Sequence, residues 1–138
     1  MQTRTTNNSI NITNSEMSRV AVKLFFAITN EWDLTDEQRC ILAGLATRTT
    51  LMNWRQKLEA KEPVKLSRDT LERLSYIAGI YKALQILFTE KANWRDWVTK
   101  PNEDFGGQSA LQRMLAGNML DLADVRRYLD GWRGAHYA

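Results

Sequence analysis

Signals that start and stop α-helices recur along the whole chain, and they constrain its fold more than any other feature of the sequence. Thr35 and Gln38 have the spacing of a capping box, and Gly44 stands where the helix that they open should end. Other capping residues precede apolar residues at helical spacing: Ser15, Thr47, Ser67, Asn93, Ser109 and Asp121. No segment alternates apolar and polar residues as a half-buried strand does. The sequence therefore predicts an all-α fold.

These signals divide the chain of 138 residues into four parts. Residues 1–14 are rich in Thr, Asn and Ser and have almost nothing to bury, so we expect a disordered tail. Residues 15–66 and 93–138 each hold short amphipathic helices, and residues 67–92 hold one longer helix between them. Its wide apolar stripe is expected to be buried on two sides within the chain, to pack against a second copy, or both. Residues 67–92 are therefore the candidate dimerisation segment.

Side chains that catalyse reactions or bind metals are scarce. Cys40 and His136 are the single cysteine and the single histidine, so no cluster of His and Cys ligands is available for a metal ion. No pair of carboxylates stands out for acid–base catalysis, and no glycine-rich loop has a nucleotide-binding pattern. Cys40 is expected to be a buried structural thiol. The sequence predicts no catalytic residue, no metal and no cofactor, and hence no enzyme.

The apolar stretches are too short for a membrane protein. Lys23 interrupts one, and Lys82 and Gln85 interrupt another, whereas about 20 apolar residues are needed to cross a bilayer. The polar N-terminus has no secretory signal. We expect a cytoplasmic protein without a membrane partner.

Residues 35–57 have the arrangement of a helix-turn-helix. The first helix ends in Ala43 and Gly44, whose small size permits a close approach of the second helix. The second helix has its apolar face at Leu51 and Trp54. Such a segment is typical of proteins that place the second helix in the major groove of DNA.

The helix-turn-helix segment is also basic. Between Gln38 and Leu58 it has no acidic residue and four basic ones: Arg39, Arg48, Arg55 and Lys57. The candidate DNA-binding residues are Thr47, Arg48, Thr49, Asn53, Arg55 and Lys57. Those near the start of the second helix suit base edges, and those further along, with Gln56, suit phosphates. A helical hairpin with a basic, solvated surface is the alternative.

The last third of the chain carries a series of motifs in a fixed order. They are Trp97, Pro101-Asn102, Phe105-Gly106-Gly107, Ser109-Ala110-Leu111, Gly117, Asp121-Leu122, Val125, Tyr128-Leu129 and Arg133-Gly134. This series closely resembles the Xre/MbcA/ParS antitoxin toxin-binding domain. Since the helix-turn-helix upstream matches the other part of that architecture, the resemblance covers roughly Met17 to Gly134.

The resemblance implies a function. Members of this family are antitoxins encoded beside a RES-domain toxin, an enzyme that degrades NAD or transfers a group from it. The C-terminal domain sequesters the toxin, and the helix-turn-helix binds operator double-stranded DNA, usually as a homodimer, so that the complex represses its own operon. The alternative is a stand-alone transcription regulator whose C-terminal helices sense a protein or a ligand.

The end of the chain offers candidate toxin-binding residues, namely Arg126, Arg127, Trp132, Arg133, His136 and Tyr137. Arg and aromatic side chains dominate many protein interfaces, and arginines with a free carboxylate suit a pocket built for a dinucleotide. Core packing is the alternative for Trp132, and disorder is the alternative for His136 and Tyr137. Gly134 is expected to end the last helix and to leave a short tail.

Overall fold

The computed structural model describes the backbone of residues 2–137 and the side chains of residues 15–132 and 134. Its helices are α1 (Gln2–Glu31), α2 (Asp36–Ala43), α3 (Arg48–Glu59), α4 (Arg68–Leu87), α5 (Lys91–Trp97), the 3-10 helix η1 (Glu103–Phe105), α6 (Ala110–Met114) and α7 (Met119–Tyr137). No strand forms in this described part, where an isolated bridge between Pro101 and Ser109 is the only β pairing. The predicted all-α fold is confirmed. No described helix is long and apolar enough to cross a membrane.

The predicted caps of α2, α4 and α6 are confirmed. Thr35 accepts a hydrogen bond from the Gln38 amide at 3.2 Å, and the Gln38 side chain accepts one from the Thr35 amide at 2.9 Å. Ser109 and Gln112 form a second capping box, and Ser67 caps α4. These caps satisfy backbone donors that would otherwise have no partner in the helix.

Four helix ends differ from the prediction. α7 begins at Met119, so Asp121, which was expected to cap it, lies in its first turn. α1 begins at Gln2 and takes in the residues expected to form a tail, because its sequence contains no Pro or Gly and Ser, Thr and Asn oppose a helix only weakly. α5 begins after Glu90, so Asn93 lies inside it. α7 continues through Gly134 to Tyr137. A glycine ends a helix when it adopts the left-handed conformation, and Gly134 does not.

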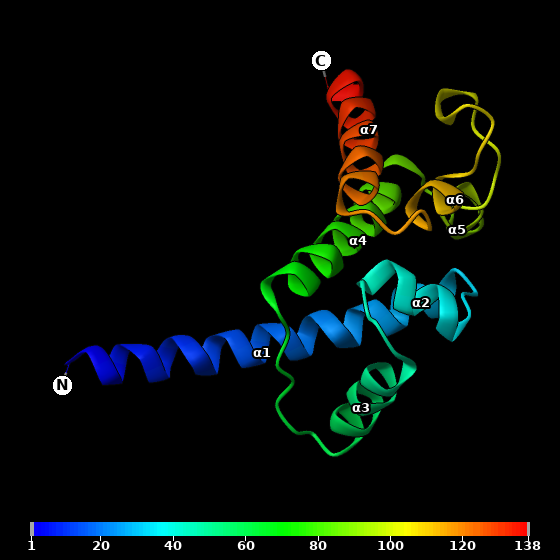
Figure 1. Ribbon diagram of the computed structural model, residues 1–138. Coiled ribbons are helices and arrows are strands. Elements are labelled where there is room, and N and C mark those ends of the chain that lie inside the picture. Colours follow the sequence, from blue (N-terminus) through cyan, green and yellow to red (C-terminus); the bar gives the residue numbers. More distant parts are fainter. Residues whose placement is uncertain (1, 138) are drawn as a thin grey trace.

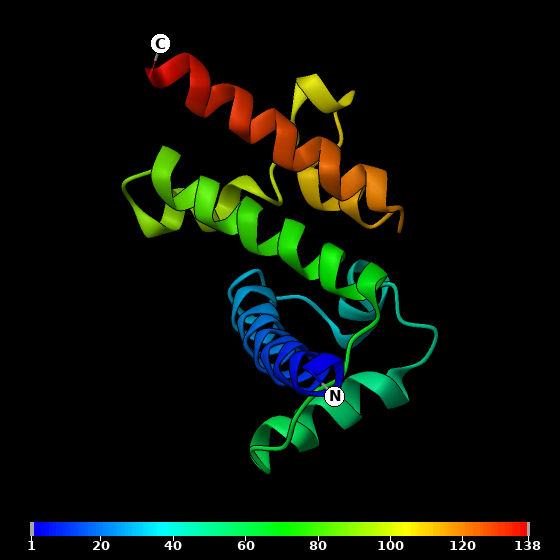
Figure 2. The same ribbon diagram turned by 90° about the vertical axis from the view of Figure 1, so that its left-hand side faces the viewer.

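α4 is the central helix of the fold. It lies between α1 on one side and α7 on the other (Figures 1 and 2). Its side chains Leu74, Ile77, Ile80 and Leu84 are almost completely buried. The apolar stripe of residues 67–92 is thus covered within one chain, and little of it faces outward.

A buried arginine joins α2 to the end of α1. The Arg39 guanidinium donates hydrogen bonds to Thr29 Oγ1 at 2.8 Å, to Asn30 Oδ1 at 2.5 Å and to Asp36 at 2.9 Å. Asp36 also accepts two hydrogen bonds from Arg55 of α3, at 2.9 and 2.5 Å. Asp36 therefore links α2 to α3 directly, and Arg39 extends this network to α1.

These contacts change the ionisation of Asp36. The hydrogen bonds from Arg55, and less strongly those from Arg39, keep the pKa of Asp36 well below its usual value, although burial opposes the shift. A carboxyl whose pKa is lowered by folding stabilises the fold above its unfolded pKa, and that stabilisation is lost as the pH falls. The helix-turn-helix should therefore be sensitive to acid.

We predict that Asp36→Asn destabilises the chain by about 2 kcal/mol in urea unfolding at neutral pH, because Arg39 stays buried without its carboxylate. Wild-type stability should fall from about pH 4, the unfolded pKa, toward pH 2, and the variant should lose less over this range. Glu37→Gln is the matched control, since Glu37 is exposed and lies beside Asp36. Equal pH profiles for wild type and Asp36→Asn would contradict the assignment.

Candidate functional site

The turn between α2 and α3 depends on Gly44. This residue has φ +70°, in the left-handed region that favours glycine, and a Cβ atom on it would lie 2.7 Å from Nε of Arg73. The Gly44 amide donates to the Ile41 carbonyl at 3.2 Å, which closes the end of α2. The predicted end of the helix at Gly44 is confirmed. The group that approaches Gly44 closely is the Arg73 side chain of α4, and not the second helix as predicted.

α3 is anchored on one face and open on the other. Leu51 and Trp54 are buried, and the Trp54 ring meets the Phe25 ring of α1 edge-on at 6.3 Å. Residues offset from these by about half a turn are exposed. They are Thr49, Met52, Asn53 and Gln56.

This exposed face contains some of the predicted DNA-binding residues. Thr49 and Asn53 lie on it, and Thr47 and Arg48 are exposed at the start of α3. The Arg48 side chain is 71% exposed, and its guanidinium stays 3.8 Å from Asp36. Lys57 lies at the flank and is half-buried. Amide, hydroxyl and guanidinium groups are therefore gathered near the N-terminal half of α3.

Arg55 takes part in the packing of α3. Its guanidinium is held by Asp36 and lies 5.0 Å from the centre of the Phe26 ring. Its side chain is still 42% exposed, and the phosphate contact stays a prediction. Gln56 lies on the outward face of α3 with Thr49 and Asn53. These three residues are four and three positions apart, and this helical spacing in the sequence places them on one face.

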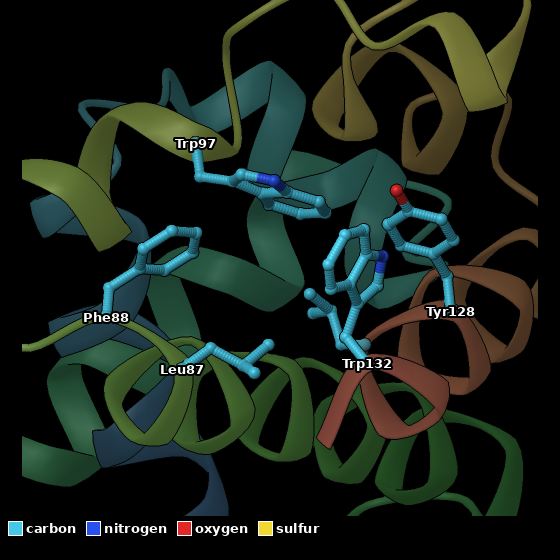
Figure 3. A pocket seen from close by; sticks show the side chains of 6 residues that line it. Leu87, Phe88, Trp97, Tyr128 and Trp132 are labelled. Atoms are coloured by element: carbon cyan, nitrogen blue, oxygen red, sulfur yellow. The ribbon is translucent and has the colours of Figure 1, made fainter. Parts of the chain in front are cut away.

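The second candidate site is an aromatic pocket between the end of α4, α5 and α7. It has a volume of about 270 Å³ and is lined by Leu87, Phe88, Trp97, Tyr128, Leu129 and Trp132 (Figure 3). Trp97 stacks on Tyr128 at 6.2 Å, and Trp132 meets Tyr128 edge-on at 6.3 Å. The Tyr128 hydroxyl donates to Asp104 at 2.6 Å, which fixes the ring.

Trp132 is the open wall of this pocket. It is 51% exposed, although tryptophan is highly buried on average in folded proteins. Core packing was the alternative for Trp132, and the structure shows instead a ring that is half in solvent. The other lining residues come from three separate elements, so no spacing in the sequence indicated that they would meet.

The arginines of α7 differ from one another. Arg126 bonds Asp130 at 3.0 Å and lies directly over Gly79 of α4, where a Cβ atom would be 1.5 Å from Nη1. Arg127 is 80% exposed and lies 3.8 Å from Asp124. Arg126 is thus a packing residue, and Arg127 is open to a partner. The side chains of the remaining candidates lie outside the described residues, namely Arg133, His136 and Tyr137.

Polar contacts connect the two halves of the chain. Arg73 of α4 donates to the Gly117 carbonyl at 2.9 Å while its side chain covers Gly44. At the other end of α4, the Tyr81 hydroxyl donates to Glu31 of α1, and burial together with this bond raises the pKa of Tyr81 to about 12. The α3 surface and the aromatic pocket are therefore parts of one packed structure.

Comparisons with known proteins identify both halves. Residues 14–79 match the model of the antitoxin Xre-like helix-turn-helix domain, and residues 83–134 match that of the antitoxin Xre/MbcA/ParS C-terminal toxin-binding domain. An uncharacterized protein of Sinorhizobium fredii, y4oB, is 42% identical over 122 residues, which cover 87% of this chain and 91% of that protein. The aromatic pocket lies within the second match and α3 within the first. The chain belongs to the Xre/MbcA/ParS antitoxins and is a non-enzymatic regulator with a helix-turn-helix domain and a toxin-binding domain.

Proposed function

We propose that this antitoxin neutralises a RES-domain toxin that consumes NAD, and that its homodimer represses its own operon by binding operator DNA through α3. The observation that carries the toxin-binding part is the half-exposed Trp132 beside the aromatic pocket. Buried Trp, Tyr and Arg side chains contribute most of the binding energy at many protein interfaces. The pocket offers Trp132 as an anchor and a cavity for an apolar side chain of the toxin.

The mode of inhibition is a steric block. Arg127 lies on α7 close to Trp132 in sequence, and α7 continues to Tyr137. A toxin that docks on the pocket would have the end of α7 next to it. Arginine groups suit the phosphates of a dinucleotide site. We therefore expect Arg133, His136 and Tyr137 to cover or fill the NAD pocket of the toxin.

We predict that Trp132→Ala lowers the affinity for the RES-domain protein encoded beside this chain by about 30-fold, the effect of losing an interface anchor of about 2 kcal/mol. Isothermal titration calorimetry measures this affinity directly. Leu120→Ala is the matched control, since Leu120 is 75% exposed on the same helix but does not line the pocket. Equal affinities for wild type and Trp132→Ala would remove the pocket from the interface.

Deletion of residues 134–138 tests the steric block separately. We predict that the shortened chain still binds the toxin through the pocket but leaves NAD consumption only partly inhibited. Undiminished inhibition of NAD loss would show that the end of α7 plays no part.

The DNA-binding half makes a different prediction. Asn53→Ala should lower operator affinity by about tenfold and relax the preference at one base pair, because an asparagine can pair with an adenine edge. Arg48→Ala should lower operator affinity by a similar factor and relax the preference at another base pair, because an arginine can donate two hydrogen bonds to a guanine edge. Fluorescence anisotropy with operator and single-base-pair variants of it identifies the base pair that each residue reads. Lys100→Ala, an exposed cation outside the helix-turn-helix, is the control. Unchanged operator affinity in both α3 variants would contradict this assignment.

A further inference from the structure

α1 carries an apolar stripe that is exposed in the described part of the chain. Met17 is 54% exposed, Val20 is 65% exposed and Leu24 is 39% exposed, and Ala27 is exposed as well. Their spacing alternates between three and four residues, which is the a and d pattern of a helix that packs along another helix. This stripe is separate from the core face of the same helix, where Phe25 is buried.

The stripe lies in the second half of α1, where its side chains face solvent. The first half of α1, which leads up to the stripe, extends away from the other helices (Figure 1). A second copy of α1 that lies antiparallel along the stripe would therefore place its own second half along this extended half. The sequence indicated residues 67–92 as the candidate dimerisation segment. The apolar side chains of its helix, α4, are buried between α1 and α7.

Two charges beside the stripe indicate the direction of the partner. Glu16 and Lys23 are exposed, lie at equivalent g positions of the seven-residue repeat, and form no ion pair in the described part of the chain. In an antiparallel helix pair, g positions of the two helices face one another; in a parallel pair, g faces e. The e positions here are Ala21 and Ile28, which offer no charge.

We propose that two copies of this chain associate through α1 as an antiparallel, two-fold symmetric helix pair. Met17 of one copy packs against the partner's Val20, and Val20 packs against the partner's Met17. In this alignment Glu16 faces the partner's Lys23, and Lys23 faces the partner's Glu16. A single register thus forms the contacts between Met17 and Val20 and both ion pairs. A two-fold axis requires such self-complementarity. The inference rests on the proposed homodimer and assigns its surface.

Sedimentation velocity of the full-length chain over a range of concentrations tests the surface. Val20→Glu should raise the dimer dissociation constant by at least about 100-fold, because the symmetric interface would bury two unpaired carboxylates. Leu120→Glu is the matched control, since Leu120 is also an exposed apolar residue but lies on α7. Both variants should keep wild-type helical content by circular dichroism, because each replaced side chain is exposed. A dimer that Val20→Glu leaves intact would overturn the surface and leave the proposed dimeric repressor standing.

Charge reversal tests the antiparallel register. Glu16→Lys alone and Lys23→Glu alone should each weaken the dimer, by about three- to tenfold at low salt, because each places like charges opposite one another twice. The double variant should recover wild-type affinity, since both ion pairs form again with exchanged signs. A double variant weaker than either single one would overturn the register. A chain that stays monomeric at every concentration would overturn this inference and the proposed homodimer together, while toxin binding would be unaffected.

Discussion

The burial of α4 between α1 and α7 is the interaction on which the rest of the structure depends. Ile77, Ile80 and Leu84 have almost no exposed surface, and replacing any of them by alanine would cost about 2–5 kcal/mol. Because α4 starts beside the helix-turn-helix and ends beside the aromatic pocket, one helix positions both functional surfaces. Arg73, at the first end, and Tyr81, toward the second, add polar contacts to the same arrangement.

This shared helix gives a physical reason why toxin binding and DNA binding should influence one another. The two matched domains are adjacent in sequence, and each packs on α4. A toxin docked on Phe88 and Trp132 would contact the C-terminal end of α4, while its N-terminal end carries the Arg73 contact to the α2–α3 turn. A shift of α4 at its C-terminal end would therefore also move the side chains that pack at its N-terminal end. Coupling between the two sites is reciprocal by thermodynamic necessity.

Local features of the structure could be predicted from the sequence, and contacts between distant segments could not. The caps at Thr35 and Ser109 depend on residues three positions away, so their patterns are readable without a fold. The bond of Arg55 to Asp36 was not predicted, because Asp36 lies across a turn, where charge counting does not show the pairing. The aromatic pocket needs the ends of α4, α5 and α7 to meet. Gly134 was expected to end α7, although a glycine does so only when it adopts the left-handed conformation.

In the proposed complex, the toxin occupies the aromatic pocket of the C-terminal domain and leaves the outward face of α3 free. Hydrogen–deuterium exchange of the antitoxin, alone and with the RES-domain toxin proposed as its partner, distinguishes this arrangement from others. We expect slower exchange at the end of α4, in α5 and in the second half of α7, around Trp97 and Trp132, with little change in α3. Protection confined to α3, or no protection around the pocket in a complex that has formed, would contradict it.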